Sequence, residues 1–298
     1  MLSVLFIVAV AGIFYGILGR TRSLLSGRKG HKLLQPIFNL RLLLRKGEVI
    51  SVSTSFIFQA APVIAFTATV MAMLMLPFGK FGAAISFSGD FVLFACLLAL
   101  SRFAMILGAL DTASSFEGMG ASREALYGML IEPAFFVLTG TFVLLTGNDS
   151  MSEIFTMLHS GSFNSIIPGL LASFAFFLML LVETGRLPVD DPRTHLELTM
   201  IHEVMILDYS GFDLALIHIS TMIKSAVYSS LTVLCILPAS LHFAIYMPVF
   251  VILVLAVPVT VGFFESFRAR NRLQRNPSYV LTVTVMAIIA FITAAVIR

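Results

Sequence analysis

The chain has 298 residues, of which 58% are hydrophobic and only 12% charged, and its mean hydropathy is +0.99. A typical soluble domain is about a quarter charged, so a single globular core of this size could not bury so much apolar surface, whereas a bilayer can. The formal charge of +3 is small, and no basic tail or alternation of basic and aromatic residues indicates a nucleic-acid partner.

Eight apolar runs are long enough to cross about 30 Å of hydrocarbon as helices. They fall near residues 2–19, 55–77, 90–111, 125–146, 164–183, 215–237, 243–264 and 279–297. The first run lacks the positively charged segment that begins a signal peptide, so we interpret it as an uncleaved span. We therefore predict an all-α integral membrane protein with about eight transmembrane helices, forming a single membrane domain over residues 1–298.

The basic residues are distributed unevenly between the two sides of these spans. Fifteen of the nineteen fall in loops on one side: Arg20, Arg22, Arg28, Lys29, Lys32, Arg41, Arg45, Lys46, Arg123, Arg186, Arg193, Arg268, Arg270, Arg272 and Arg275. Only Lys80 and Arg298 lie on the other side. Because cytoplasmic loops carry excess Lys and Arg, we expect loops 20–54 and 184–214 to face the cytoplasm. Both termini would then lie outside the cytoplasm, in a multi-pass protein of the inner (cell) membrane.

The first cytoplasmic loop contains a predicted surface helix. Across residues 32–46, leucines and an isoleucine recur at helical spacing between basic residues, which is typical of an amphipathic helix that lies on a membrane. Pro36 would begin or bend this helix. Two interpretations remain open, a linker that contacts lipid and a docking platform for a soluble partner. Arg41, Arg45 and Lys46 are candidates for docking.

Ionisable side chains within the spans or at their ends are costly unless a partner, a wet cavity or a function accounts for them. Arg102 lies within the third span, which Asp111 ends, and Glu132, followed by Pro133, lies within the fourth; Glu183 closes the fifth and Lys224 lies within the sixth. A dehydrated carboxyl can exchange protons near neutral pH, as a proton path requires. The alternative is that the two basic residues pair with acids and only hold helices together.

The densest group of charges follows the fifth span. It comprises Glu183, Arg186, Asp190, Asp191, Arg193, His195, Glu197, His202, Glu203, Asp208 and Asp213. Residues 196–207 have helical spacing, and Asp191 and His195, four apart, would share a face if that helix had started. A solvated cytoplasmic face is the ordinary explanation for such a loop. The pair His202-Glu203 begins like a zinc-protease motif, but Ile206 stands where its second histidine must be.

Metal chemistry has no clear place in the sequence. Cys96 and Cys235 stand in separate apolar runs, whereas iron–sulfur, zinc and nickel sites need clustered ligands. We therefore expect no metal or cofactor in this chain. The patterns alone indicate a multi-span protein with buried acids, either a transporter or a subunit of a complex.

One stretch carries a specific resemblance. Its residues are Leu110-Asp111-Thr112, Ser114, Phe116, Gly120-Ala121-Ser122-Arg123-Glu124-Ala125-Leu126, Gly128 and Glu132-Pro133. This stretch resembles the formate hydrogenlyase subunit 4 family, the membrane-anchor subunits of energy-converting (group 4) nickel–iron hydrogenases. We expect Ser122 to cap the fourth helix and Glu124 to favour its positive end.

Two further stretches resemble the homologous subunit 1 family of respiratory complex I. The longer contains Glu183-Thr184-Gly185-Arg186-Leu187-Pro188-Val189-Asp190, Glu197-Leu198 and Asp208-Tyr209-Ser210-Gly211; the weaker contains Gly27-Arg28-Lys29-Gly30 and Gln35-Pro36-Ile37. In that family a surface helix of the first loop contacts the hydrophilic arm. The resemblance therefore adds Arg28, Lys29 and Gln35 to the docking candidates.

The resemblance implies a proton path that connects electron transfer in a cytoplasmic arm to ion translocation. Five acids match acidic positions of the family: Glu132, Glu183, Asp190, Glu197 and Asp208. Spacing adds Asp191 and Glu203. The supporting charges would be Arg102, Asp111, Arg123, Glu124, Arg186, His195 and Lys224.

The implied partners are cytoplasmic hydrogenase-like and iron–sulfur subunits, antiporter-like membrane subunits and the lipid bilayer. Iron–sulfur clusters and, where it is retained, nickel–iron would lie in the partners. Arg193 and His195 stand where the complex I loop has glutamates, and Asp208-Tyr209-Ser210-Gly211 arrives about three residues later, so we expect no quinone. The alternatives are a quinone-site subunit of complex I and a stand-alone secondary transporter, a class that typically shows internal repeats and broken helices.

Overall fold

The computed structural model describes residues 2–51, 53–158, 166–190, 200–238, 241–269, 271 and 275–297. The helices are α1 (Leu2–Leu25), α2 (Gln35–Leu43), α3 (Phe56–Met75), α4 (Asp90–Asp111), α5 (Ser115–Thr146), α6 (Met151–Met157), α7 (Ile166–Glu183), the 3₁₀ turn η2 (Glu203–Ile206), α8 (Gly211–Leu234), α9 (Phe243–Phe267) and α10 (Asn276–Ile297). Eight of them are long and apolar enough to cross a membrane. The prediction of an all-α membrane protein is confirmed.

Two spans are longer than their apolar runs. The helix α1 continues to Leu25, beyond the predicted end near residue 19, and α5 begins at Ser115 rather than near residue 125. Ser122 therefore lies inside α5, where its hydroxyl donates to the carbonyl of Met119 at 2.9 Å, and the prediction that it caps the helix is wrong. The residue before α5, Ser114, has extended backbone, so the helix starts there.

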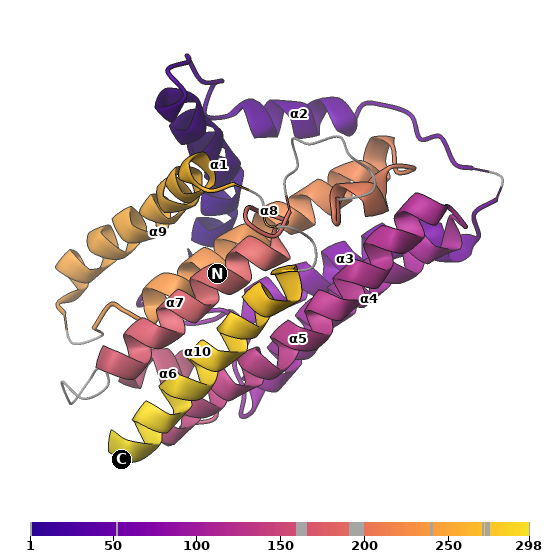
Figure 1. Ribbon diagram of the computed structural model, residues 1–298. Coiled ribbons are helices and arrows are strands. Elements are labelled where there is room, and N and C mark those ends of the chain that lie inside the picture. Colours follow the sequence, from indigo (N-terminus) through magenta and orange to yellow (C-terminus); the bar gives the residue numbers. More distant parts are fainter. Residues whose placement is uncertain are drawn as a thin grey trace.

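The predicted amphipathic helix is present as α2. Pro36 lies in its first turn and therefore begins the helix rather than bending it. The helix lies across one end of the bundle, where it contacts α1 and α8 (Figure 1). We call this end of the molecule the α2 end.

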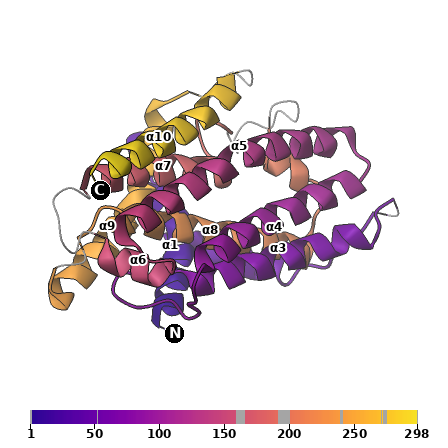
Figure 2. The ribbon, with the colours of Figure 1, turned by 90° about the horizontal axis from the view of Figure 1, so that it is seen from below.

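The helix α8 lies at the centre of the bundle and contacts α1, α3, α7 and α9 (Figures 1 and 2). In their most apolar windows, α8 and α7 are 72% and 67% buried, whereas the other six spans are each less than half buried. The pairs α3 with α4, α4 with α5, and α5 with α10 pack along one side. The central position of α8 matters because two of its ionisable residues reach the site described below.

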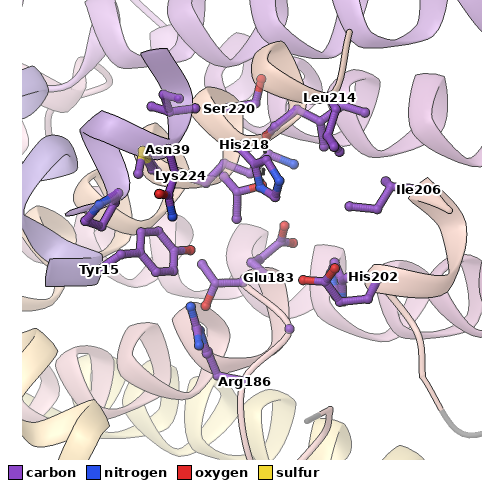
Figure 3. Close-up of a pocket in the computed structure, with 18 of the residues that line it drawn as sticks. Tyr15, Asn39, Glu183, Arg186, His202, Ile206, Leu214, His218, Ser220 and Lys224 are labelled. Carbon is purple, nitrogen blue, oxygen red and sulfur yellow. Dashed lines mark hydrogen bonds between the residues drawn. The ribbon is translucent and has the colours of Figure 1, made fainter. Parts of the chain in front are cut away.

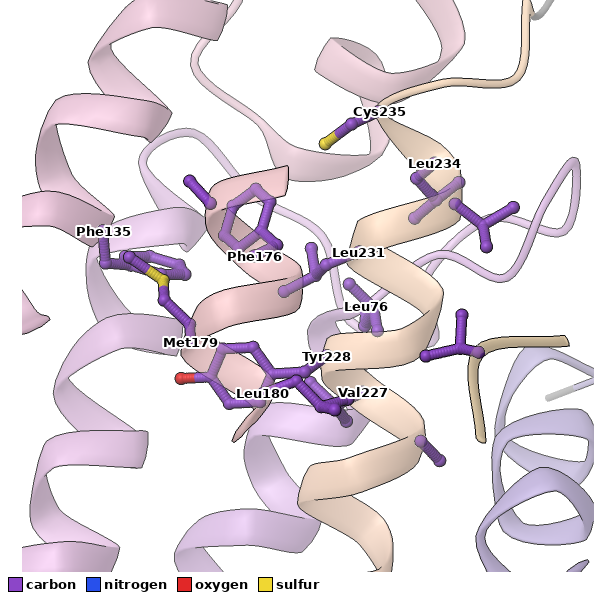
Figure 4. Close-up of a cluster of buried hydrophobic side chains, with 14 of the residues drawn as sticks. Leu76, Phe135, Phe176, Met179, Leu180, Val227, Tyr228, Leu231, Leu234 and Cys235 are labelled. Atoms are coloured by element: carbon purple, nitrogen blue, oxygen red, sulfur yellow. The ribbon is translucent and has the colours of Figure 1, made fainter. Parts of the chain in front are cut away.

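Close packing around α8 depends on small residues. Ser225, Ala226, Ser229 and Ser230 are buried in this helix, and small side chains let helices approach closely in a membrane. The hydroxyls of the three serines donate to carbonyls of α8 itself, at 2.6–2.8 Å, so they are satisfied without a partner helix. Larger side chains from α5, α7 and α8 complete the core (Figure 4).

Candidate functional site

A cavity of about 780 Å³ lies beneath α2. Its walls come from α1–α5, α7, α8 and the segments that follow α7 and contain η2 (Figure 3). This volume is within the range of sites that bind small molecules. Among the described residues, eight of those that line it are charged: Arg22, Arg102, Glu124, Glu183, Arg186, Asp190, Glu203 and Lys224.

Arg102 of α4 joins three glutamates from two other helices. Its Nη1 lies 2.9 Å from Oε1 of Glu132, and its Nε lies 3.4 Å from Oε1 of Glu124; both acids belong to α5. Its Nη2 donates to Glu183, the last residue of α7. Arg102 is buried, and a buried guanidinium requires such partners. We call these four residues the Arg102 cluster.

Gly128 of α5 makes room for the guanidinium. A Cβ added at this position would lie 2.5 Å from Nη1 and 2.9 Å from Cδ of Arg102. Such distances are shorter than any normal contact, so a larger residue would displace the arginine. The glycine of the hydrogenase-like motif therefore has a local physical reason.

His202 connects the Arg102 cluster to the segment that follows α7. Its Nε2 lies 3.4 Å from Oε2 of Glu124, and its Nδ1 lies 3.9 Å from Oδ2 of Asp190. Although burial opposes the imidazolium, the carboxylates of Glu124 and Asp190 raise the pKa of His202 above its ordinary value. Burial also opposes the charged form of Asp190 and would raise its pKa. The His202 side chain and two backbone N–H groups outweigh this effect and hold the pKa of Asp190 below its ordinary value.

The two ends of this chain of polar groups differ in exposure. Asp190 is buried and accepts from the backbone N–H of Ile201 at 2.9 Å. The side chain of Glu132, by contrast, is 46% exposed, against 9% for Glu124 and 2% for Glu183. A continuous series of contacts therefore runs from Asp190 through His202, Glu124 and Arg102 to Glu132, near the middle of α5, on the outer surface of the bundle.

A second ionic cluster lies on another wall of the cavity, and sequence reasoning missed it. Nη1 of Arg22 lies 2.8 Å from Oε2 of Glu265, and Nη1 of Arg186 lies 3.7 Å from Oε1 of the same carboxylate. The guanidinium carbon of Arg186 lies 4.7 Å from the centroid of the Tyr15 ring. We call these four residues the Glu265 cluster. Of its members, the sequence had indicated only Arg186, as a supporting charge; Glu265 is an acid at the end of the apolar run 243–264.

The predicted site residues Lys224 and Glu203 also line the cavity. Lys224, on α8, has no carboxylate within 4 Å among the described residues. Within that part of the chain, it therefore forms no ion pair that would hold helices together. Glu203 lies in η2 and is partly buried. His218, which the sequence analysis did not single out, lines the same wall from α8.

Three other predicted residues have structural contacts outside the cavity. Asp111 accepts from the backbone N–H and hydroxyl of Ser55, both at 2.7 Å, and so caps α3. Arg123 donates to the carbonyl of Met200 at 2.9 Å. Asp208 is exposed, and its backbone N–H donates to Glu117 at 3.1 Å. Asp191, His195 and Glu197 lie outside the described residues.

The residues proposed for partner docking lie around α2. Five are exposed: Arg28, Lys29, Arg41, Arg45 and Lys46. Gln35 is instead partly buried and lines the cavity. Among the described residues, no three histidine, cysteine or acidic side chains are grouped closely enough to hold a metal ion. Of the two cysteines, Cys235 is buried and Cys96 is exposed.

Comparisons with known proteins place the chain among membrane subunits. The model of the NADH dehydrogenase family matches residues 1–296. Hydrogenase-4 component C of Escherichia coli is 30% identical over 226 residues, which cover 76% of this chain and 70% of the relative. Formate hydrogenlyase subunit 4 of the same organism is 27% identical over 302 residues, covering 98% of this chain and 97% of the relative.

A relative from an NADH-linked complex also matches. This subunit of the NADH-quinone oxidoreductase of Rubrobacter xylanophilus is 30% identical over 203 residues, covering 66% of this chain and 60% of the relative. Among solved structures, a chain of the membrane-bound sulfane sulfur reductase, an archaeal respiratory membrane complex, matches with a TM-score of 0.83 and 21% identity. The match covers 98% of this chain and 97% of the other, and it shows that the two share a fold.

Proposed function

The chain belongs to the NADH dehydrogenase family, together with its hydrogenase and NADH-quinone oxidoreductase relatives, and on this premise we propose that it is the non-catalytic membrane-anchor and proton-path subunit of a hydrogenase-type or hydrogenase-related complex. It would couple electron transfer in a cytoplasmic arm to ion translocation. The observation that carries the proposal is the Arg102 cluster, which joins the cavity to the outer surface of the bundle.

The charges of the Arg102 cluster explain why protons would enter it. Three carboxylates share one guanidinium, so the fully ionised cluster would carry a net charge of −2 within its own four residues. Two unit charges 5 Å apart repel by about 3 kcal/mol at an effective dielectric constant of 20. A proton on one carboxyl leaves two carboxylates beside the guanidinium and so lowers this repulsion. Any event in the cavity that adds or removes positive charge would therefore change the number of protons that the cluster holds.

The exposed carboxyl of Glu132 indicates where a membrane partner would bind. An ionised carboxylate near the middle of a spanning helix costs about 2.5–3.5 kcal/mol when it faces lipid. A polar membrane subunit against this face would remove that cost and receive the proton. We propose that an antiporter-like membrane subunit occupies this position.

The α2 end is the proposed docking site for the cytoplasmic arm. Exposed basic residues surround α2, and the neighbouring segment carries Asp190 and His202 into the cavity. In this orientation both termini lie outside the cytoplasm. Iron–sulfur clusters and, where it is retained, nickel–iron would lie in hydrogenase-like and iron–sulfur partners, because this chain is proposed to carry no cofactor.

A second candidate function, a quinone site, is favoured by the volume of the cavity and by apolar residues in its wall such as Leu18, Met105 and Ile217. We propose the proton-path role instead because four carboxyls line the same space, and a chain of carboxyls serves proton exchange whereas a neutral quinone ring does not require it. Reduction of a soluble quinone analogue by the purified complex would favour the second function. Electron transfer that is indifferent to such analogues would favour the first.

The test of the proton path replaces single carboxyls in the assembled complex. Glu132→Gln and Glu183→Gln should leave the subunits co-purifying in gentle detergent but should reduce proton movement in proteoliposomes at least several-fold. Glu153→Gln, which alters an exposed acid of α6, is the matched control and should leave proton movement unchanged. Normal proton movement in fully assembled Glu132→Gln and Glu183→Gln complexes would contradict the proposal.

A further inference from the structure

We propose that Tyr209 is a positioning residue of the candidate site: its hydroxyl supplies a hydrogen bond that Pro62 leaves open in α3 and thereby fixes the η2 wall of the cavity, next to His202. Tyr209 itself is not one of the residues that line the cavity. Its effect on proton movement rests on the proposed function, whereas its effect on the cavity wall does not.

The carbonyl of Phe58 lacks its helical donor. In an α-helix each backbone N–H donates to the carbonyl four residues earlier, and Pro62, inside α3, has no N–H to donate to Phe58. Phe58 is buried, and a buried carbonyl without a donor is costly. The helix therefore needs a donor from elsewhere in the molecule.

Tyr209 supplies this donor from the segment between η2 and α8. Its hydroxyl donates to the carbonyl of Phe58 at 3.0 Å, and the two rings stack with their centroids 4.0 Å apart and their planes within 5° of parallel. Gly108 of α4 leaves room for the contact, because a Cβ there would lie 2.3 Å from the hydroxyl oxygen. Burial raises the pKa of Tyr209, so the hydroxyl keeps its proton and remains a donor.

The Tyr209 contact supports one wall of the cavity. Tyr209 belongs to a small hydrophobic cluster, four members of which line the cavity: Met105, Ile206, Leu214 and Ile217. Two of them, Ile206 and Leu214, are drawn beside His202 in Figure 3. In the backbone, Tyr209 donates to the carbonyl of Ile206 and Met205 donates to that of His202, both at 3.2 Å. A short hydrogen-bonded segment therefore connects the tyrosine to the histidine.

The residues on either side of Tyr209 are held by other elements. The backbone N–H of Asp208 donates to Glu117 of α5 at 3.1 Å, and the hydroxyl of Ser210 accepts from the backbone N–H of Val49, between α2 and α3, at 2.9 Å. Neither contact involves the tyrosine side chain. Replacing Tyr209 by phenylalanine keeps both contacts and the stacked ring, and therefore removes the hydroxyl bond to α3 alone.

The experiment uses the assembled complex in gentle detergent and in proteoliposomes. Tyr209→Phe should lower the unfolding temperature by about 2–5 °C, because the Phe58 carbonyl is left unpaired. Backbone amides of residues 203–206 should exchange hydrogen about tenfold faster, because this wall opens more often. Proton movement should fall several-fold. Tyr279→Phe is the matched control: it removes a hydroxyl that has no hydrogen-bond partner among the described residues, and should change none of the three.

Pro62→Ala separates positioning from the mere pairing of a carbonyl. It restores the N–H of α3, and a carbonyl can accept two donors, so this variant alone should keep the Tyr209 contact. In the double variant with Tyr209→Phe, the carbonyl is again paired and the unfolding temperature should recover. Fast exchange at 203–206 and weak proton movement should persist, because η2 is still not joined to α3.

Two results would overturn the proposal. One is normal exchange at 203–206 in Tyr209→Phe; the other is full recovery of exchange and proton movement in the double variant, which would leave the hydroxyl no role beyond pairing the carbonyl. If Glu183→Gln also moves protons normally, the proposed function fails, and the exchange measurement alone still decides whether Tyr209 fixes the wall. If Glu183→Gln is impaired while Tyr209→Phe moves protons normally, Tyr209 does not position the site.

Discussion

Replacing Gly128 by alanine should uncouple the protein and lower its stability. The added methyl would lie 2.5 Å from Nη1 and 2.9 Å from Cδ of Arg102, so one of them must move. The far end of an arginine is flexible, and its displacement is the easiest response in packing terms. That displacement would, however, separate the guanidinium from Glu132 and Glu183, which now bind its two terminal nitrogens.

The part of the stability change that comes from packing is the balance of two effects. Alanine stabilises a helix interior by about 1 kcal/mol relative to glycine. Overpacking a filled site costs about 1–3 kcal/mol. These two packing effects alone would lower the free energy of unfolding of Gly128→Ala by about 0–2 kcal/mol, and the loss of the ion pairs with Glu132 and Glu183 would lower it further. Gly140 lies on the same helix, and a Cβ there would meet nothing within 4 Å, so Gly140→Ala should gain the full 1 kcal/mol or so.

The assay compares the two variants in one preparation of the complex. Thermal unfolding in detergent measures stability, and proton movement in proteoliposomes measures coupling. Gly128→Ala should lose most of the proton movement, whereas Gly140→Ala should retain it and unfold at a slightly higher temperature. The reasoning is refuted if Gly128→Ala gains as much stability as Gly140→Ala and moves protons normally, because the guanidinium would then not occupy the position described.

Three further predictions concern the surroundings of the site. In Gly120→Ala, the new methyl would lie 2.3 Å from a side-chain carbon of η2, so thermal unfolding should show a loss of about 1–3 kcal/mol. Because the pKa of His202 is raised in the folded protein, its contacts with Glu124 and Asp190 stabilise the fold fully below the pKa of the unfolded chain. This stabilisation is lost as pH rises through the pKa of the folded protein. The free energy of unfolding measured from pH 6 upward should therefore fall with pH in the wild type and more weakly in His202→Gln. Asp111→Asn should cost about 1 kcal/mol in the same assay, because the α3 cap loses its charged acceptor.

The spans could be predicted because their apolar runs match the thickness of a bilayer, but the start of α5 could not. Its first ten residues contain Glu117, Arg123 and Glu124, which have the composition of a loop. In the structure Glu117 and Glu124 are buried, and Glu124 contacts Arg102 and His202. A charge that is paired across helices is indistinguishable in the sequence from a charge that faces water.

The same distinction explains which site residues were found. The cost of charge at membrane depth singled out Arg102, Glu132 and Glu183, and all three meet in one cluster. Arg22 and Glu265 stand near the ends of their apolar runs, where charges are ordinarily solvated, so the same reasoning passed over them. Which acid each arginine binds depends on how α1, α4, α5, α7 and α9 pack, and no local pattern encodes that arrangement.

In the proposed function, Lys224 offers a way for partner binding at α2 to act on the Arg102 cluster through charge alone, without direct contact between the partner and the cluster. It lies in the wall of the same cavity, close enough to interact electrostatically with Arg102 and Glu124, yet it forms no ion pair within 4 Å in the described part of the chain. Its helix, α8, also contacts α2. In the proposed function, a partner that shifts α2 would alter the distance between Lys224 and Glu124. Since charge interactions at an effective dielectric constant of 20 reach about 4 kcal/mol at 4 Å, a displacement of a few ångströms would suffice to change how strongly the three carboxyls hold a proton.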